Sequence, residues 1–302
     1  MVYYINKNIY TLHIDKLFLG LIYKLIKLLI YLEGDDFLVS SNSMLFMILT
    51  FLVSTILPIS LVIFFYKKEK ISLKVVLIAA IAFFISTQIL EASIHKVVLV
   101  NNKTTAEFFE NPWFYMLYAG FMSGIFEEVS RYLMFKFVLK NNRQWKDGLA
   151  YGLGHGSIEA MLLVGVTFFN NIIMAFQINS GNFQKLLQLE NAPVDVLNEI
   201  YIRMVNLPSY IWGIASIERI CTMIIQVGLS LIVLYAVRER KVIYLFLAIL
   251  IHAIVDFLPA LHQVGAIQSI AIVEEFLIIL TALMLIFIMK SKKIFKNAGI
   301  SN

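Results

Sequence analysis

The stretch GFMSGIFEEVSRYLMFKF, residues 120–137, determines how this sequence is interpreted, because it places charged residues inside an apolar run. Glu127, Glu128 and Arg131 lie in its middle, where each charge costs about 2.5–3.5 kcal/mol in a membrane-spanning helix. On a helix, Arg131 is four residues from Glu127 and three from Glu128, so one guanidinium can orient either carboxylate. We expect such charges to face a polar cavity or one another.

The composition of the whole chain predicts a membrane protein. Hydrophobic residues make up 60% of its 302 residues and charged residues only 15%, a lower charged share than soluble domains have. No signal-peptide pattern is visible at the N-terminus, so we expect the chain to be anchored by its own helices. The net charge of +5 comes from basic residues beside apolar runs, a pattern typical of cytoplasmic loops rather than of a nucleic-acid surface. The single cysteine, Cys221, excludes an internal disulfide and a metal site made of cysteines.

Seven apolar runs have the length needed to cross a hydrocarbon core, about 20 residues. Every odd-numbered run ends in a cluster of lysines and arginines, so the positive-inside rule predicts that the body of the protein is N-out/C-in. The predicted fold class is therefore all-α, a polytopic transmembrane helical bundle of about seven spans. The runs lie at residues 44–66, 72–91, 113–139, 148–170, 210–237, 242–258 and 266–289.

The chain divides into an extension and a main body. Residues 1–41 form an N-terminal extension, in which residues 17–32 are apolar with lysines on roughly one face. This pattern favours an amphipathic helix lying at the membrane interface, with an eighth span as the alternative. Residues 42–302 are predicted to form a single transmembrane helical domain. Its external polar loop, residues 171–209, could act as a lid or as an amphipathic helix over the spans.

Ionisable residues on two other spans fall at a similar depth to the charged pair, counting about 1.5 Å per residue along each helix. The fourth run carries His155 and Glu159, and the sixth run carries His252 and Asp256. Each pair is four residues apart and shares a helix face. A single intramembrane histidine is often only a hydrogen-bonded link between helices. The repeated spacing at one depth instead favours a functional site.

The fifth run adds Glu218, Arg219 and Gln226, for which a structural role and a functional role weigh equally. The fourth run is also rich in glycine. Small residues of this kind allow the close approach of a neighbouring helix or a substrate chain. The glycines concerned are Gly148, Gly152, Gly154 and Gly156.

These residue types suit hydrolysis by general acid–base catalysis. Burial favours the neutral form of a carboxyl group and a nearby guanidinium favours its ionised form, so Glu127 and Glu128 could take different roles. A histidine could transfer a proton or stabilise an oxyanion. The zinc-protease motif H-E-x-x-H does not occur, Ser157 lies on a different helix face from His155, and Asp256 has no intramembrane aspartate to pair with. No cofactor is expected, although histidine and carboxylate ligands would also suit a divalent metal, Zn²⁺ or Mn²⁺.

Three motifs together resemble a known family. E-E-V-S-R, G-H-G-S-I-E and H-A-I-V-D, which begin at residues 127, 154 and 252, are similar to motifs of the YhfC family of bacterial membrane proteins. That family is regarded as related to the CPBP (Abi) superfamily of glutamate intramembrane proteases, which includes the type II CAAX prenyl endopeptidases. The resemblance covers residues 44–290 and implies a peptidase of the bacterial cytoplasmic membrane. It further implies that Glu127 and Glu128 activate water, that Arg131 orients them, and that His155 and His252 complete the site.

The sequence departs from the wider superfamily at two points. Two residues rather than three separate Glu128 from Arg131, and Gln226 stands on the span where relatives carry a histidine. The leading hypothesis is an intramembrane glutamate-type endopeptidase whose partners are membrane lipid and a membrane-anchored peptide or protein. The alternatives are a transporter of protons or divalent cations, and a non-catalytic immunity or binding protein; the inverted repeats typical of transporters are not evident. The candidate catalytic residues are Glu127, Glu128, Arg131, His155, Glu159, His252 and Asp256.

Overall fold

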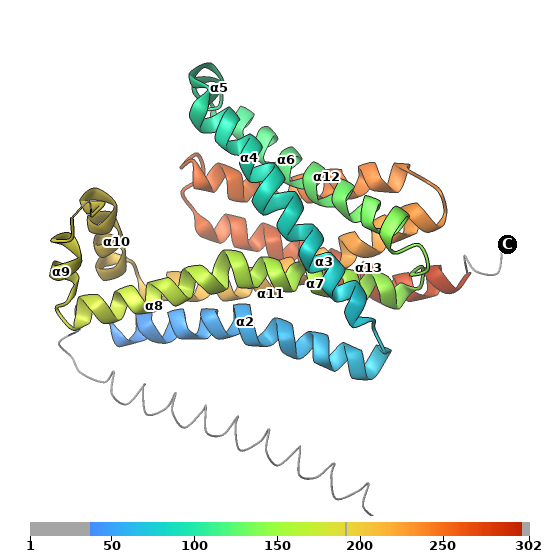
Figure 1. Ribbon diagram of the computed structural model, residues 1–302, viewed down its shortest axis with the longest axis horizontal. Helices are drawn as coiled ribbons and strands as arrows, with labels where there is room; N and C mark the ends of the chain where they lie inside the picture. The colour runs from blue at the N-terminus through green and yellow to red at the C-terminus, as the bar shows by residue number, and fades with distance from the viewer. Residues whose placement is uncertain (1–36, 191, 298–302) are drawn as a thin grey trace, which may run out of the picture. The chain divides into compact units, whose positions relative to one another are not determined.

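The computed structural model describes residues 37–190 and 192–297, and it confirms the predicted all-α class, with no strand among these residues. The predicted helix at residues 17–32 lies outside the described residues. Figure 1 shows the helices in chain order. The first stretches are α2 (Ser41–Glu69), the run α3 (Leu73–Phe83), η1 (Phe84–Glu91), α4 (Ala92–His95) and η2 (Lys96–Asn101), and the short α5 (Lys103–Phe108).

The remaining helices hold the residues of greatest interest. Two of the stretches change to a π-helical hydrogen-bond pattern over a few residues without breaking. The helices are α6 (Pro112–Leu133) with η3 (Met134–Val138), α7 (Trp145–Glu159) with η4 (Ala160–Gly165) and α8 (Val166–Asn179), α9 (Phe183–Leu187), α10 (Val194–Asn206), α11 (Ser209–Arg238), α12 (Ile243–Gln263) and α13 (Ile270–Asn297).

Each of the seven predicted spans coincides with one continuous helical stretch, and six of these are long and apolar enough to cross a membrane. The stretch outside the six is α6 with η3, because Glu127, Glu128 and Arg131 lower its hydropathy. Several helices extend past their predicted ends, the second and the fourth by the most. The second helix continues to Asn101 and the fourth to Asn179, since polar residues that end an apolar run do not break backbone hydrogen bonding. The predicted loop accordingly contains the end of α8 together with α9 and α10.

The described residues divide into two compact units. The first takes residues 37–49 and 168–213, and in it the Asn179 side chain accepts a hydrogen bond from the backbone N–H of Val39 at 2.9 Å and donates one to its carbonyl at 3.0 Å. The second takes residues 50–167 and 214–297 and contains every candidate catalytic residue. The single transmembrane domain, the N-out/C-in orientation and the lid over the spans stay predictions.

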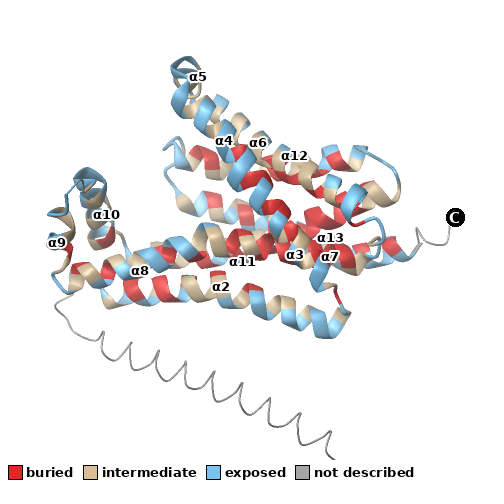
Figure 2. Cartoon of the chain, viewed as in Figure 1, coloured by how far each residue is buried: buried red, intermediate tan, exposed pale blue. Residues whose placement is uncertain are grey.

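Close helix contacts in the second unit depend on glycine. A Cβ added to Gly124 of α6 would lie 2.8 Å from the carbonyl oxygen of Ile249 in α12, and one added to Gly152 of α7 would lie 2.4 Å from the Cα of Val227 in α11. Only glycine permits these approaches, as expected for tightly packed membrane helices. Helix α6 packs along α12, and α7 packs along α3. Figure 2 shows buried positions on α7 and α11.

Local capping fixes where the two central helices begin. Asn111 precedes Pro112, and its side chain accepts from the backbone N–H of Trp113 at 3.0 Å, which is a favourable start for α6. At the start of α7, Asp147 accepts from the backbone N–H of Gln144 at 2.9 Å and from the Asn142 amide at 3.0 Å. Because each cap fixes the first residue of its helix, it also fixes how far along the helix axis the carboxylates of α6 and the imidazole of α7 lie.

Candidate active site

The candidate site is built around the carboxylate of Glu127, which is 6% exposed. Its Oε2 lies 2.8 Å from Nε2 of His155 on α7 and accepts a hydrogen bond from Nε2 of Gln226 on α11 at 3.1 Å. The Nε2 of His252 on α12 is 3.7 Å from the same oxygen. One carboxylate oxygen of α6 therefore meets side chains from three other helices.

The neighbouring carboxylate, Glu128, is fully buried and differently placed. Its Oε1 lies 2.8 Å from Nδ1 of His252 and 3.4 Å from a terminal nitrogen of Arg131. Its other oxygen, Oε2, has no hydrogen-bond partner among the described residues. Arg131 therefore pairs with Glu128 at the three-residue spacing, and Glu128 in turn holds one ring nitrogen of His252.

Gln226 connects the charged groups. Its Oε1 accepts from Arg131 at 2.5 Å, its backbone carbonyl accepts from the same guanidinium at 3.1 Å, and its Nε2 donates to both Glu127 and Glu159, the latter at 2.9 Å. A guanidinium only donates hydrogen bonds, so the amide oxygen must face Arg131 and the amide nitrogen must face the carboxylates. This orientation makes Gln226 the bridge between Arg131 and two acids.

Glu218 and Arg219, the other two residues of the fifth span whose role the sequence left undecided, also connect to the cluster. Arg219 donates to Oε1 of Glu159 at 3.1 Å and to Oε1 of Glu218 at 2.6 Å. Glu159 is thus held on one oxygen by Arg219 and on the other by Gln226. Of the three, Gln226 touches Glu127 directly, whereas Arg219 acts through Glu159.

Asp256 lies at the edge of the cluster. Its Oδ2 is 3.6 Å from Nε2 of His252, and its side chain is 33% exposed. The hydroxyl of Ser123, four residues before Glu127 on α6, is 3.2 Å from the same His252 nitrogen. All seven candidate catalytic residues therefore belong to one connected cluster, and their catalytic roles stay predictions.

Sequence reasoning missed three polar residues near this cluster. Ser123 shares a helix face with Glu127 through their four-residue spacing, which was the available signal. Glu91 and His95 repeat the four-residue spacing of the other two pairs inside an apolar run, and their side chains lie 3.2 Å apart. The predicted span ended at Glu91, so the pair was divided. The hydroxyl of Ser157 is buried without a hydrogen-bond partner, which agrees with its exclusion as a histidine-activated nucleophile.

Two sets of ligand atoms could hold a divalent cation, each set lying within 4.8 Å. The first is Glu127, His155 and Glu159, and the second is Glu127, Glu128 and His252. Three imidazole and carboxylate ligands that leave a position for water are typical of catalytic zinc sites, so both sets fit such an ion in kind and number. The second set contains the unpartnered Glu128 oxygen, whereas in the first set the Gln226 amide already binds two of the oxygens.

Comparison with known proteins agrees with this helical membrane architecture. A family described as YhfC intramembrane metalloprotease matches residues 53–277. The chain therefore belongs to the YhfC family, as its three motifs indicated, and is an integral multi-pass membrane protein. It is 40% identical over 259 residues to a Bacillus subtilis (strain 168) protein named "Uncharacterized membrane protein YhfC", a match that covers 86% of this chain and 100% of that protein. No solved structure matches the chain.

Proposed function

We propose that the protein is an intramembrane endopeptidase that hydrolyses a peptide bond of a membrane-anchored substrate, with water activated at Glu127. The observation that carries this proposal is the contact of Glu127 Oε2 with His155 Nε2 at 2.8 Å, inside a buried cluster to which four helices contribute. A carboxylate and an imidazole at hydrogen-bond distance form a general-base pair. The description of the family as proteases favours this function over transport.

The different contacts of the two acids support a different role for each in this proposal. Glu127, with His155, takes a proton from water as the water oxygen attacks the carbonyl carbon, and the same proton is then delivered to the leaving amine as the C–N bond breaks. Glu128 does not face this water; it binds Nδ1 of His252 and fixes the ring. In this proposal the opposite nitrogen of His252 stabilises the oxygen of the tetrahedral intermediate. Arg131 holds Glu128 in place.

A metal-dependent form of the same reaction is supported by the family description and by the two ligand sets. A divalent ion bound there would polarise the carbonyl and lower the pKa of a bound water. In the set of Glu127, Glu128 and His252, the unpartnered Glu128 oxygen would serve as a ligand. In that form His155 remains the group closest to Glu127 and moves the proton.

The test uses purified full-length protein in proteoliposomes with a panel of peptides, each containing one transmembrane segment, and mass spectrometry of the products. Glu127→Gln keeps the side-chain size but removes the base, and we expect cleavage to fall by about 10²–10⁴-fold. Glu275→Gln is the matched control, because Glu275 is exposed on α13 and lies outside the cluster. Equal cleavage by wild type and Glu127→Gln would refute the proposed base.

Elemental analysis of the same preparation separates the two forms of the reaction. A stoichiometric metal, together with cleavage that a chelator abolishes and Zn²⁺ or Mn²⁺ restores, supports the metal-dependent form. Full activity in protein without metal supports the carboxylate-activated form. Ion flux without cleavage of any peptide would contradict the peptidase function and support the transport alternative.

A further inference from the structure

A cavity of about 440 Å³ adjoins the catalytic cluster. It lies between the helical run from η1 to η2, helix α6 and helix α12. Ser123 and Asp256 form its inner end, and both contact Nε2 of His252, at 3.2 and 3.6 Å. The cavity therefore begins where the proposed chemistry takes place.

Helix periodicity shows the direction in which the cavity runs. On α6, its lining residues Tyr115, Ala119 and Ser123 follow one another at four-residue spacing, and Glu127 is the next step of the same ladder. From Ser123 to Tyr115 the helix rises about 12 Å. On α12 the lining continues from Asp256 to the end of the helix. The cavity thus extends the catalytic cluster for about two turns toward one end of the bundle.

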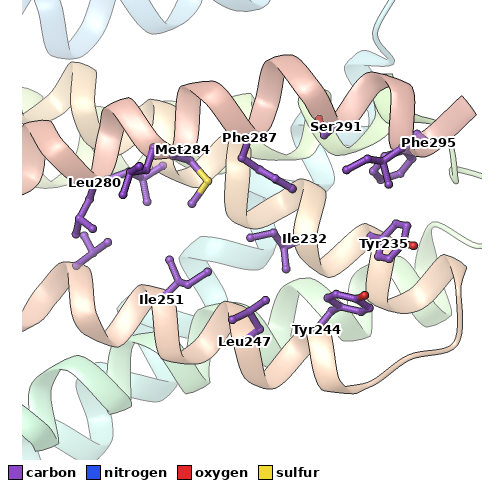
Figure 3. A pocket seen from close by; sticks show the side chains of 14 residues that line it. Ile232, Tyr235, Tyr244, Leu247, Ile251, Leu280, Met284, Phe287, Ser291 and Phe295 are labelled. Carbon is purple, nitrogen blue, oxygen red and sulfur yellow. The ribbon is translucent and has the colours of Figure 1, made fainter.

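The lining of this cavity holds more polar side chains than the linings of the other cavities of the same unit. Figure 3 shows a cavity of about 500 Å³ between α11, α12 and α13 that is lined mostly by apolar side chains such as Ile232, Leu247, Ile251 and Met284. Such a lining suits contact with hydrocarbon chains. Polar walls at membrane depth instead indicate a space that admits water and a polar ligand.

Two carboxylates, Glu91 and Asp256, give this cavity its charge. Glu91, 8% exposed, lies 3.2 Å from Nε2 of His95, and the opposite ring nitrogen of His95 lies 2.9 Å from the hydroxyl of Tyr118. All three residues line the cavity, and so does Asp256. No lysine or arginine is among the lining residues. Apart from His95, which is bound to Glu91, the lining has no basic residue to offset its two carboxylates, and this favours a cationic group.

We propose that this cavity is the substrate subsite beside the scissile bond, and that Glu91 and Asp256 select a lysine or arginine side chain of the substrate there. The inference rests on the proposed peptidase function for its biological meaning, but binding in the cavity can be measured without cleavage. Glu91 is the specificity-determining residue, because Asp256 also contacts His252 and belongs to the catalytic cluster.

The test introduces a cysteine into the cavity wall by Leu99→Cys, in a Cys221→Ala background that removes the native thiol. In detergent-solubilised protein, the modification rate of this cysteine by a cationic thiol reagent is measured alone and in the presence of a transmembrane peptide with one flanking lysine. Matched peptides carry glutamine or glutamate at that position. Val100→Cys is the control, because Val100 is the next residue, is 73% exposed and does not line the cavity.

We expect the lysine peptide to protect the cysteine at position 99 at about tenfold lower concentration than the glutamine peptide, the smallest factor expected for a hydrogen bond to a charged group. The glutamate peptide should protect least. Glu91→Gln should remove most of this difference and Glu91→Lys should reverse it, whereas Glu107→Gln, an exposed change on α5, should leave it intact. Equal protection by the three peptides, or protection by none, overturns the subsite.

Cleavage of the same peptides distinguishes this inference from the proposed function. Preferred cleavage of the lysine peptide that is lost in Glu91→Gln supports both. Cleavage without preference for lysine overturns the proposed subsite but still supports the proposed peptidase function. Lysine-dependent protection without cleavage of any peptide supports the subsite and contradicts the peptidase.

Discussion

Gln226→Leu is the substitution that most directly tests the organisation of the cluster. It removes three side-chain hydrogen bonds, those with Arg131, Glu127 and Glu159, whose exposed fractions are 0%, 6% and 8%. Hydrogen bonds between membrane helices average about 0.6 kcal/mol, which gives about 2 kcal/mol for three. Hydrogen bonds to charged groups in soluble proteins are worth about 1.5–3 kcal/mol, which gives at least about 4.5 kcal/mol.

The expected loss of stability for Gln226→Leu is about 2–4 kcal/mol, because each partner keeps another contact. Arg131 retains the Gln226 carbonyl and Glu128, while Glu127 retains His155. We expect kcat/KM to fall at least about 10²-fold, since Glu127 loses one of the two hydrogen bonds that position it. The assays are reversible unfolding of detergent-solubilised protein and cleavage of the peptide panel in proteoliposomes.

Two further variants serve as comparisons for Gln226→Leu. Ser230→Ala lies one turn further along α11, where the buried hydroxyl has no hydrogen-bond partner, so it should leave stability and cleavage near the wild-type values. Gln226→His keeps one acceptor for Arg131 and one donor for a carboxylate, and should fall between Gln226→Leu and wild type. The reasoning is refuted if Gln226→Leu behaves like Ser230→Ala, or if Gln226→His recovers nothing.

The remaining predictions concern packing and charge pairing. Gly152→Ala should lower stability by about 1–3 kcal/mol and reduce cleavage, because the added Cβ would lie 2.4 Å from the backbone of Val227; Gly156→Ala, whose Cβ has 3.3 Å to its nearest neighbour, should cost less. Equal unfolding free energies for the two variants would contradict this account. Arg131→Met should cost about 3–5 kcal/mol because it removes the guanidinium that pairs with buried Glu128 and leaves only His252 beside that carboxylate. Arg131→Lys should preserve more stability but should still lose cleavage, because lysine lacks the forked geometry of the guanidinium. A stable, active Arg131→Met would exclude an essential ion pair.

The sequence by itself determined the class of the protein and selected the candidate residues of its site. Apolar runs of about 20 residues define spans because a bilayer imposes that length, and helices are the form in which one segment satisfies its own backbone there. Charges in such runs are costly, so Glu127, His155 and His252 could be selected from depth and four-residue spacing alone. The same signal was available for Glu91 and His95, but the predicted span stopped at Glu91, the first acidic residue of the run, whereas the helix continues to Asn101.

Only the tertiary structure decided which of these groups contact one another. Helical spacing allowed Arg131 to pair with either acid, and packing against α11 and α12 assigned it to Glu128 and Gln226. The role of Gln226 was undecided in sequence because an amide can serve as a link or as part of a site; its partners come from residues far away in the chain. Spacing along one helix fixes which residues share a face, but contacts between helices depend on rotation and close approach, which glycines such as Gly152 permit and the whole bundle sets.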